Sequence, residues 1–169
     1  MRRALAWIWF LLLALLLFFG AALFASATPE ELAFALGLFA FLLLANPLVF
    51  GYSGLINFLA EVRAGTGKAE AVAEATRVPA SQLEGMEGLA LAAFWLRELA
   101  PYRYAYYGLF LLLLLVALAP QLAGGAFAWA GTLAGALWGA AVPTVLVFGL
   151  ELAATLGLAS LAKELKPDK

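Results

Sequence analysis

The sequence contains no cysteine and no histidine. Without cysteine there are no disulfides, thiol nucleophiles or iron–sulfur clusters. Without histidine the chain lacks the usual ligands of zinc and haem and the commonest general base. Aspartate occurs only at Asp168, and no serine has an evident base beside it. We therefore expect a protein that is not an enzyme and that holds no metal or cofactor.

Charge is also scarce. Only 12% of the 169 residues are charged, against about 25% in soluble proteins. Hydrophobic residues make up 66%, and lipid tails solvate such a surface where water would not. The formal net charge of −1 provides no basic field for nucleic acid. The composition predicts an all-α integral membrane protein, one membrane domain over 1–169, surrounded by membrane lipids.

Long apolar runs mark the membrane-spanning segments. A helix needs about 20 apolar residues to cross a hydrocarbon core roughly 30 Å thick. The predicted transmembrane helices, about four in number, are 4–26, 32–60, 104–121 and 127–162. The basic start and apolar core of the first run also suit a signal peptide. Because this run is longer than the usual signal-peptide core of about 7–15 residues, we expect a retained helix.

The basic residues set the expected orientation. With four spans, all 10 lysines and arginines fall on one side of the membrane. The positive-inside rule then places the N-terminus, the segment 61–103 and the C-terminus in the cytoplasm. A five-helix alternative, which divides the last run at Pro143, would move the C-terminal lysines outside. The composition favours a multi-pass protein of a prokaryotic inner membrane.

The cytoplasmic segment 61–103 holds most of the polar residues. An Ala- and Glu-rich stretch predicts a short helix over 68–77. Ser81 and Glu84 have the spacing of a capping box, which predicts a second, interfacial helix over about 82–99. One face of that helix carries Leu89, Trp95, Leu96 and Leu99. The apolar face indicates either a docking surface for a partner subunit or packing on the protein itself.

Glu151 is the one acidic residue in the run 127–162. A carboxylate inside a membrane is costly, so it indicates either a proton or ion pathway or a protonated group that fixes helix packing. Asn46 and Asn57, in the second run, are candidates to line the same pathway. Pro47 and Pro143 interrupt the helical hydrogen bonds of the two long runs and predict kinks. Broken helices are one feature of transporter sites.

Glycines recur at intervals of four in the last run. Gly131, Gly135 and Gly139 form a stripe that allows another helix to approach closely. The partner helix of this stripe belongs either to this chain or to a second one.

Two functions follow from these features. The scarcity of reactive groups, the glycine stripe and the apolar interfacial helix favour a non-catalytic accessory subunit of a larger inner-membrane complex, such as a respiratory or transport assembly. Its partners would be other subunits or further copies of the chain. The alternative is a small oligomeric transporter or channel for an ion, proton or solute that uses Glu151.

Overall fold

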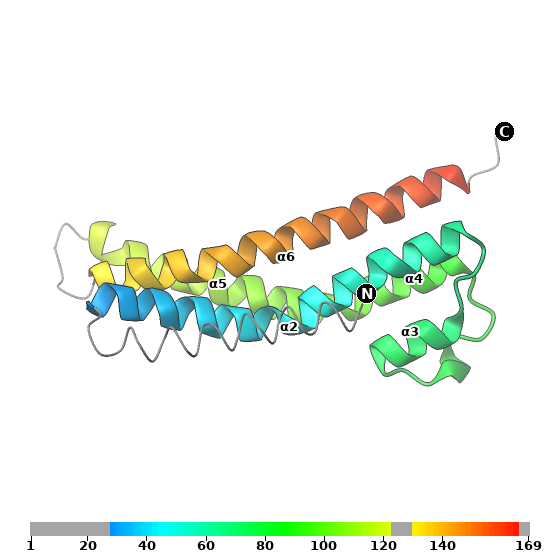
Figure 1. The fold of residues 1–169 in the computed structure, drawn as a ribbon, viewed down its shortest axis with the longest axis horizontal. Coiled ribbons are helices and arrows are strands. Elements are labelled where there is room, and N and C mark those ends of the chain that lie inside the picture. The colour runs from blue at the N-terminus through cyan, green and yellow to red at the C-terminus, as the bar shows by residue number, and fades with distance from the viewer. Residues whose placement is uncertain (1–27, 123–129, 166–169) are drawn as a thin grey trace. The chain divides into compact units, whose positions relative to one another are not determined.

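The computed structural model describes residues 28–122 and 130–165, and these residues form helices and no strands. The elements, shown in Figure 1, are α2 (Pro29–Arg63), α3 (Ala69–Thr76), the 3-10 turn η1 (Ala80–Gln82), α4 (Gly88–Glu98), α5 (Ala100–Leu122) and α6 (Ala130–Glu164). The all-α fold class is confirmed.

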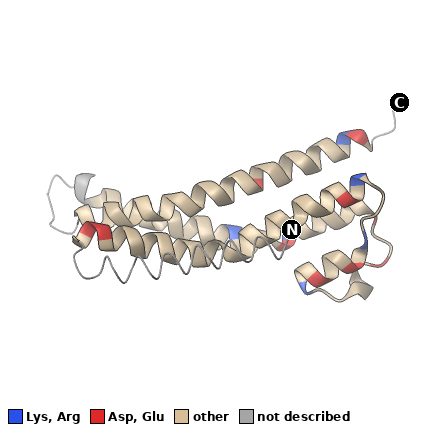
Figure 2. Cartoon of the chain, viewed as in Figure 1, with Lys and Arg blue, Asp and Glu red and all other residues tan. Residues whose placement is uncertain are grey.

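Three helices are long and apolar enough to cross a membrane. They are Pro29–Arg63, Gly88–Ala119 and Gly131–Glu164. Figure 2 shows long uncharged stretches along α5 and α6. The chain is therefore an integral membrane protein with transmembrane helices. The first predicted span, 4–26, lies outside the described residues.

The start of α2 is fixed by a capping box at Thr28 and Glu31. The Thr28 amide donates to Glu31 Oε2 at 2.8 Å, and the Glu31 amide donates to Thr28 Oγ1 at 3.3 Å. Pro29 occupies the first helical position, where its missing N–H costs nothing. Together these residues satisfy two backbone donors at the helix end and explain why α2 begins here.

The segment between α2 and α4 differs from its prediction at one helix start. Ser81 lies in η1, and α4 begins at Gly88 with Glu87 as its N-cap. Gly85, with a φ of +82°, adopts a left-handed conformation that a right-handed helix does not contain. The capping box predicted at Ser81 and Glu84 therefore does not start the helix. By contrast, α3 falls within the predicted helix 68–77.

Helix α4 continues almost directly into α5. Only Leu99 separates them, and its amide donates to the carbonyl of Trp95 at 3.2 Å. The Arg103 amide donates to the carbonyl of Leu99 at 3.0 Å, so helical hydrogen bonds bridge the junction. Pro101 falls in the first turn of α5, where a helix needs no internal donor. The candidate span thus begins at Gly88, well before the predicted 104.

The chain forms two compact units. One contains the described parts of 1–46 and 104–146, and the other contains 47–103 and the described part of 147–169. Helices α2 and α6 contribute to both units.

In the first unit, the glycine stripe of α6 packs against α2. A Cβ atom on Gly135 would lie 2.5 Å from the carbonyl oxygen of Glu30, and one on Gly139 would lie 2.7 Å from the Leu38 nitrogen. On α2, Gly37 faces Ala136 in the same way. The stripe therefore serves a contact between two helices of this chain.

Helix α5 joins the same unit through aromatic rings. Phe41 contacts Tyr106 and Phe110 edge-on, with centroids 5.5 and 5.9 Å apart. The Tyr106 hydroxyl lies 3.0 Å from Thr144 Oγ1, which donates to the carbonyl of Ala140 at 2.8 Å. These contacts link α5 to both α2 and α6.

In the second unit, α4 packs on the C-terminal part of α2. The rings of Phe58 and Trp95 are 5.9 Å apart, and Gly51 leaves room for the side chain of Leu99. Val72 of α3 and Leu83 are fully buried. The segment between α2 and α4 is therefore folded around its own small apolar core.

Candidate intramembrane ion-pair site

Glu151 on α6 forms an ion pair with Arg103 in the first turn of α5. Arg103 Nη1 donates to Glu151 Oε1 at 2.9 Å, and the two side chains are 28% and 16% exposed. Both residues belong to the second unit. Arg103 falls near the middle of the candidate span Gly88–Ala119, so the pair lies between two membrane-spanning helices.

The surrounding helix positions keep this pair in an apolar setting. Val147 and Ala154, which flank Glu151 on α6, are fully buried. The Thr155 hydroxyl donates to the backbone carbonyl of Glu151 at 2.9 Å. Its donor is therefore used within α6, and the side chain carries no charge. The guanidinium of Arg103 is therefore the charged group that the described contacts place against the carboxylate.

Tyr52 on α2 brings a third polar group to the same place. Its side chain is 0% exposed, and its hydroxyl lies against the guanidinium of Arg103. The hydroxyl lies close enough to interact electrostatically with both Arg103 and Glu151. The Tyr52 hydroxyl therefore adds a buried polar group to the ion pair.

The charges compensate each other only as a pair. A guanidinium stays protonated in proteins, and a single charge in hydrocarbon is expensive. Arg103 and Glu151 together are neutral, so they tolerate an apolar setting that neither would tolerate alone. Such a pair is weak evidence for stability, because two polar groups still lose their hydration.

The predicted site residues are only partly brought together. Asn46 belongs to the first unit, and its Oδ1 is buried without a partner among the described residues. Asn57 belongs to the second unit and is half-buried. Pro47 and Pro143 lie inside α2 and α6, and both helices continue through them. The described partner of Glu151 is Arg103, which the sequence interpretation had placed with the cytoplasmic residues.

The predicted docking face of α4 is used inside the chain. Trp95 and Leu99 are 2% and 7% exposed and pack on α2, while Leu89 and Leu96 are half-buried. Two of the four residues of this face are therefore covered within the chain. The same holds for the stripe of Gly131, Gly135 and Gly139, whose partner helix is α2.

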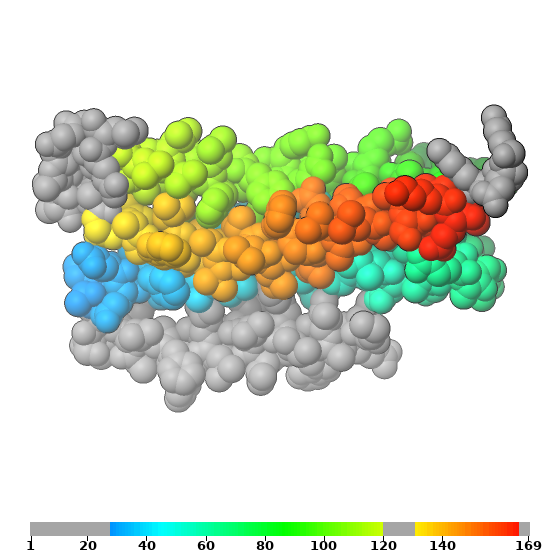
Figure 3. Space-filling view, turned by 90° about the horizontal axis from the view of Figure 1, so that it is seen from above, coloured from blue at the N-terminus to red at the C-terminus, as the bar shows by residue number. Residues whose placement is uncertain are grey.

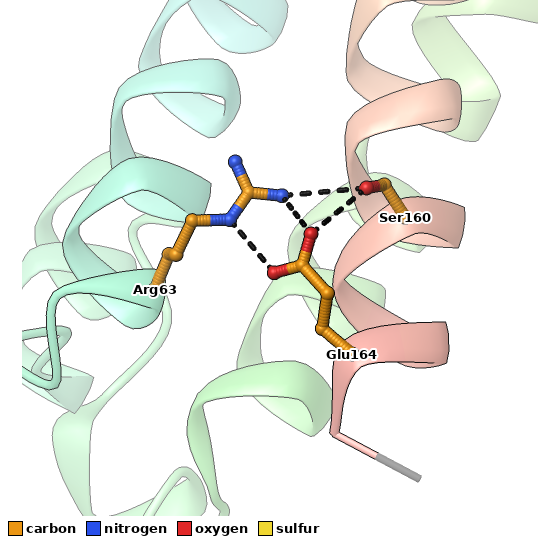
Figure 4. A network of polar contacts seen from close by, with 3 residues as sticks. All are labelled: Arg63, Ser160 and Glu164. Atoms are coloured by element: carbon orange, nitrogen blue, oxygen red, sulfur yellow. Dashed lines mark hydrogen bonds and ion pairs between the residues drawn. The ribbon is translucent and has the colours of Figure 1, made fainter.

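A second ion pair joins the C-terminal end of α2 to the C-terminal end of α6. Arg63 donates through Nε and Nη2 to the two carboxylate oxygens of Glu164, each at 2.9 Å, and the Ser160 hydroxyl donates to the same carboxylate at 3.2 Å (Figure 4). The two charged side chains are 54% and 50% exposed. The Arg63–Glu164 pair is therefore solvated, and it is the reference with which the less exposed Arg103–Glu151 pair can be compared.

No group of acidic residues in the described part of the chain has the arrangement of a metal site. Arg103 and Tyr52 are the site residues that sequence reasoning missed. Arg103 lies among Tyr102, Tyr104, Tyr106 and Tyr107, a cluster typical of a membrane interface. The available signal was Glu151 itself, because an acid inside a membrane calls for a basic partner.

Comparison with known proteins finds a relative over nearly the whole chain. The chain is 38% identical to an uncharacterized protein of Aquifex aeolicus (strain VF5), and the alignment covers 94% of this chain and 93% of that protein. No protein-family model matches the chain, and no solved structure matches it. The chain belongs to the same family as this Aquifex aeolicus protein.

Proposed function

We propose that the protein is a small membrane transporter that moves an ion or solute by way of Arg103 and Glu151. The observation that carries the proposal is the 2.9 Å ion pair between two candidate membrane-spanning helices. Charged side chains inside a membrane are costly and commonly mark the path of a substrate or proton. The neighbouring Tyr52 hydroxyl, which is buried and interacts with both charged groups, adds a polar group at the same place.

The proposal includes a topology of four transmembrane helices with both termini in the cytoplasm of a prokaryotic cell. Arg63 at the end of α2 and Glu164 at the end of α6 form an ion pair, so these two helix ends lie on the same side of the membrane. The charged segment after α2 and the charged C-terminus support a cytoplasmic position for that side. The predicted helix 4–26 would be the fourth span.

Flux measurements on the purified full chain test this proposal. Proteoliposomes loaded with a pH-sensitive dye would be challenged with Na⁺, K⁺, an imposed proton gradient and a panel of small anionic, cationic and neutral solutes. We expect the wild type to move at least one of them faster than protein-free liposomes do. Glu151→Gln, which keeps the shape of the side chain but removes its charge, would abolish that flux.

Glu164→Gln is the matched control, because it makes the same change on the same helix in an exposed ion pair. Its flux should equal that of the wild type. A folded wild-type protein that moves none of these species, or a flux that survives Glu151→Gln, would contradict the proposed function.

The second candidate function is the non-catalytic accessory subunit. Its supporting observation is the apolar surface of α6, which lies at the surface on the face shown in Figure 3. Trp138, Val145 and Phe148 are 71%, 72% and 58% exposed. Lipid or a partner subunit would cover such residues equally well. Trp95 and Leu99 of α4 and the glycine stripe of α6 contact α2, so they add less support to this function than the exposed face of α6 does.

Gentle extraction from native membranes, followed by mass spectrometry, separates the two functions. Stoichiometric partner subunits would support the accessory role, and a homo-oligomer without partners would support the transporter. A stable isolated monomer would contradict the accessory role.

A further inference from the structure

One side of α4 and of the first turn of α5 points away from the rest of the chain. Four exposed residues lie on it at helical intervals of three and four, and they are Ala90, Ala93, Arg97 and Pro101. The other side of α4 is buried. This outward face belongs to the candidate membrane span Gly88–Ala119, so its surroundings are lipid, and Arg97 is its charged residue.

The helix itself supplies no counter-charge for Arg97. Side chains three and four positions away are the ones that a helical residue reaches. For Arg97 these positions carry no charge, and they are Ala93, Phe94, Ala100 and Pro101. Glu98 is half-buried, and as the next residue in the chain it does not face Arg97. The ion pairs seen between described residues use other arginines.

The Arg97 side chain is directed toward the Gly88 end of the span. Its Cζ lies 5.3 Å from the centroid of the Phe94 ring, and Phe94 is one turn closer to Gly88. The electrostatic attraction between a guanidinium and an aromatic face favours this direction. The charged group is therefore held toward the nearer membrane surface and away from the middle of the bilayer.

The depth of Arg97 fits the level of the lipid headgroups. At about 1.5 Å per residue, its Cα lies roughly 10 Å from the middle of the span Gly88–Ala119. Half of the hydrocarbon core is about 15 Å thick. With the span centred in the bilayer, a long side chain that reaches toward Gly88 brings its guanidinium to the phosphates.

We propose that the outward face of α4 binds an anionic phospholipid whose phosphate lies on Arg97. The planar guanidinium donates two parallel hydrogen bonds to phosphate oxygens, and the small side chains of Ala90 and Ala93 leave room for the headgroup. The acyl chains would begin beside Pro101, one turn nearer the middle of the span. In the proposed topology the lipid belongs to the cytoplasmic leaflet.

Charge favours an anionic lipid over a zwitterionic one. A charged side chain at membrane depth is costly unless an opposite charge meets it. The phosphate of a zwitterionic lipid already has a cation in its own headgroup, whereas an anionic lipid brings a net negative charge to Arg97. This proposal depends on the membrane-spanning helix and not on transport, so it stands or falls separately from the proposed function.

Native mass spectrometry of the purified full chain tests the proposal. The protein, freed of lipid in detergent, would be titrated with phosphatidylglycerol and with phosphatidylcholine of the same acyl chains. We expect the wild type to prefer phosphatidylglycerol. Arg97→Gln should lower the affinity for this lipid about fivefold, as expected for one basic residue at a lipid surface, and leave phosphatidylcholine binding unchanged. Arg97→Lys, which keeps the charge without the planar fork, should retain part of the preference.

Arg77→Gln is the matched control, because Arg77 is an exposed arginine at the C-cap of α3, outside the candidate spans. Its affinity for phosphatidylglycerol should equal that of the wild type. Arg97 is exposed, so both variants should unfold at the wild-type temperature in lipid-free detergent, which separates lost binding from lost folding.

Three results would overturn the proposal. The first is equal affinity of the wild type for the two lipids. The second is a preference that Arg97→Gln retains, or that Arg77→Gln lowers by the same factor, because general charge attraction would then explain it. The third is displacement of phosphatidylglycerol by inorganic phosphate, since the face would then take a free anion and not a lipid.

Discussion

At the scale of single residues, Glu151 depends on Arg103 for its place in an apolar helix. The sequence predicts Glu151 as an enclosed acid, because it is the one acidic residue in the run 127–162. Its partner was not predictable from spacing, since 48 positions separate the two residues. Aromatic neighbours also made Arg103 resemble a residue of the membrane interface. Only the packing of α5 beside α6 shows that the two charges meet.

A double-mutant cycle measures the energy of this pair. Glu151→Gln or Arg103→Gln alone should lower the free energy of unfolding by less than the roughly 3–5 kcal/mol of a fully buried pair, because the two side chains are still 28% and 16% exposed. The effects of the two changes should not be additive. Thermal unfolding of purified protein in detergent is the measurement.

The exposed pair provides the comparison for this cycle. Arg63→Gln and Glu164→Gln remove charges that are 54% and 50% exposed, and solvated pairs contribute only about 0–1 kcal/mol. Equal coupling energies for the two pairs would show that the Arg103–Glu151 pair is as solvated as the terminal one.

At the scale of helices, the sequence predicts most elements and misplaces some of their ends. The apolar runs locate α2, α5 and α6, because hydrophobic length is the main signal of a membrane helix. The start of α4 was missed because Gly85 takes a left-handed φ of +82°, which the capping pattern at Ser81 does not reveal. The direct continuation of α4 into α5 was missed because the sequence predicts two separate helices, one over about 82–99 and one over 104–121.

The contact between α2 and α6 gives a prediction at this scale. Gly139→Ala places a methyl group 2.7 Å from the Leu38 nitrogen, and backbone atoms there cannot move aside. We expect a loss of about 1–3 kcal/mol in unfolding free energy, as for other overpacked positions.

Gly149→Ala is the matched control on the same helix. A Cβ atom at Gly149 meets nothing within 4 Å, and alanine favours a helix over glycine by about 0.8–1 kcal/mol. This change should leave stability unchanged or raise it. If both variants unfold at the temperature of the wild type, the close approach of α2 and α6 does not exist.

At the scale of the whole molecule, composition alone identifies a helical membrane protein, because 66% hydrophobic residues leave few soluble folds. The number of spans and their orientation remain predictions. Lys and Arg predict them through the positive-inside rule, although Arg97 and Arg103 lie within the candidate span Gly88–Ala119 and so carry less weight than their sequence positions suggest.

The absence of cysteine makes the topology directly testable. A membrane-impermeant maleimide applied to intact cells should label Gly125→Cys, which lies in the predicted external loop. It should label Ser81→Cys, an exposed residue of η1, only after the cells are opened. Labelling of Ser81→Cys in intact cells would reverse the orientation.

The most direct test of the account is to measure flux and thermal unfolding on the same preparation of Arg103→Gln/Glu151→Gln. The double change removes the ion pair as a unit, and neutral replacements of such pairs are often as stable as the original. We predict that this double variant unfolds within a few degrees of the wild type and carries no flux. A double variant that is folded and still transports would show that the pair serves packing and not transport.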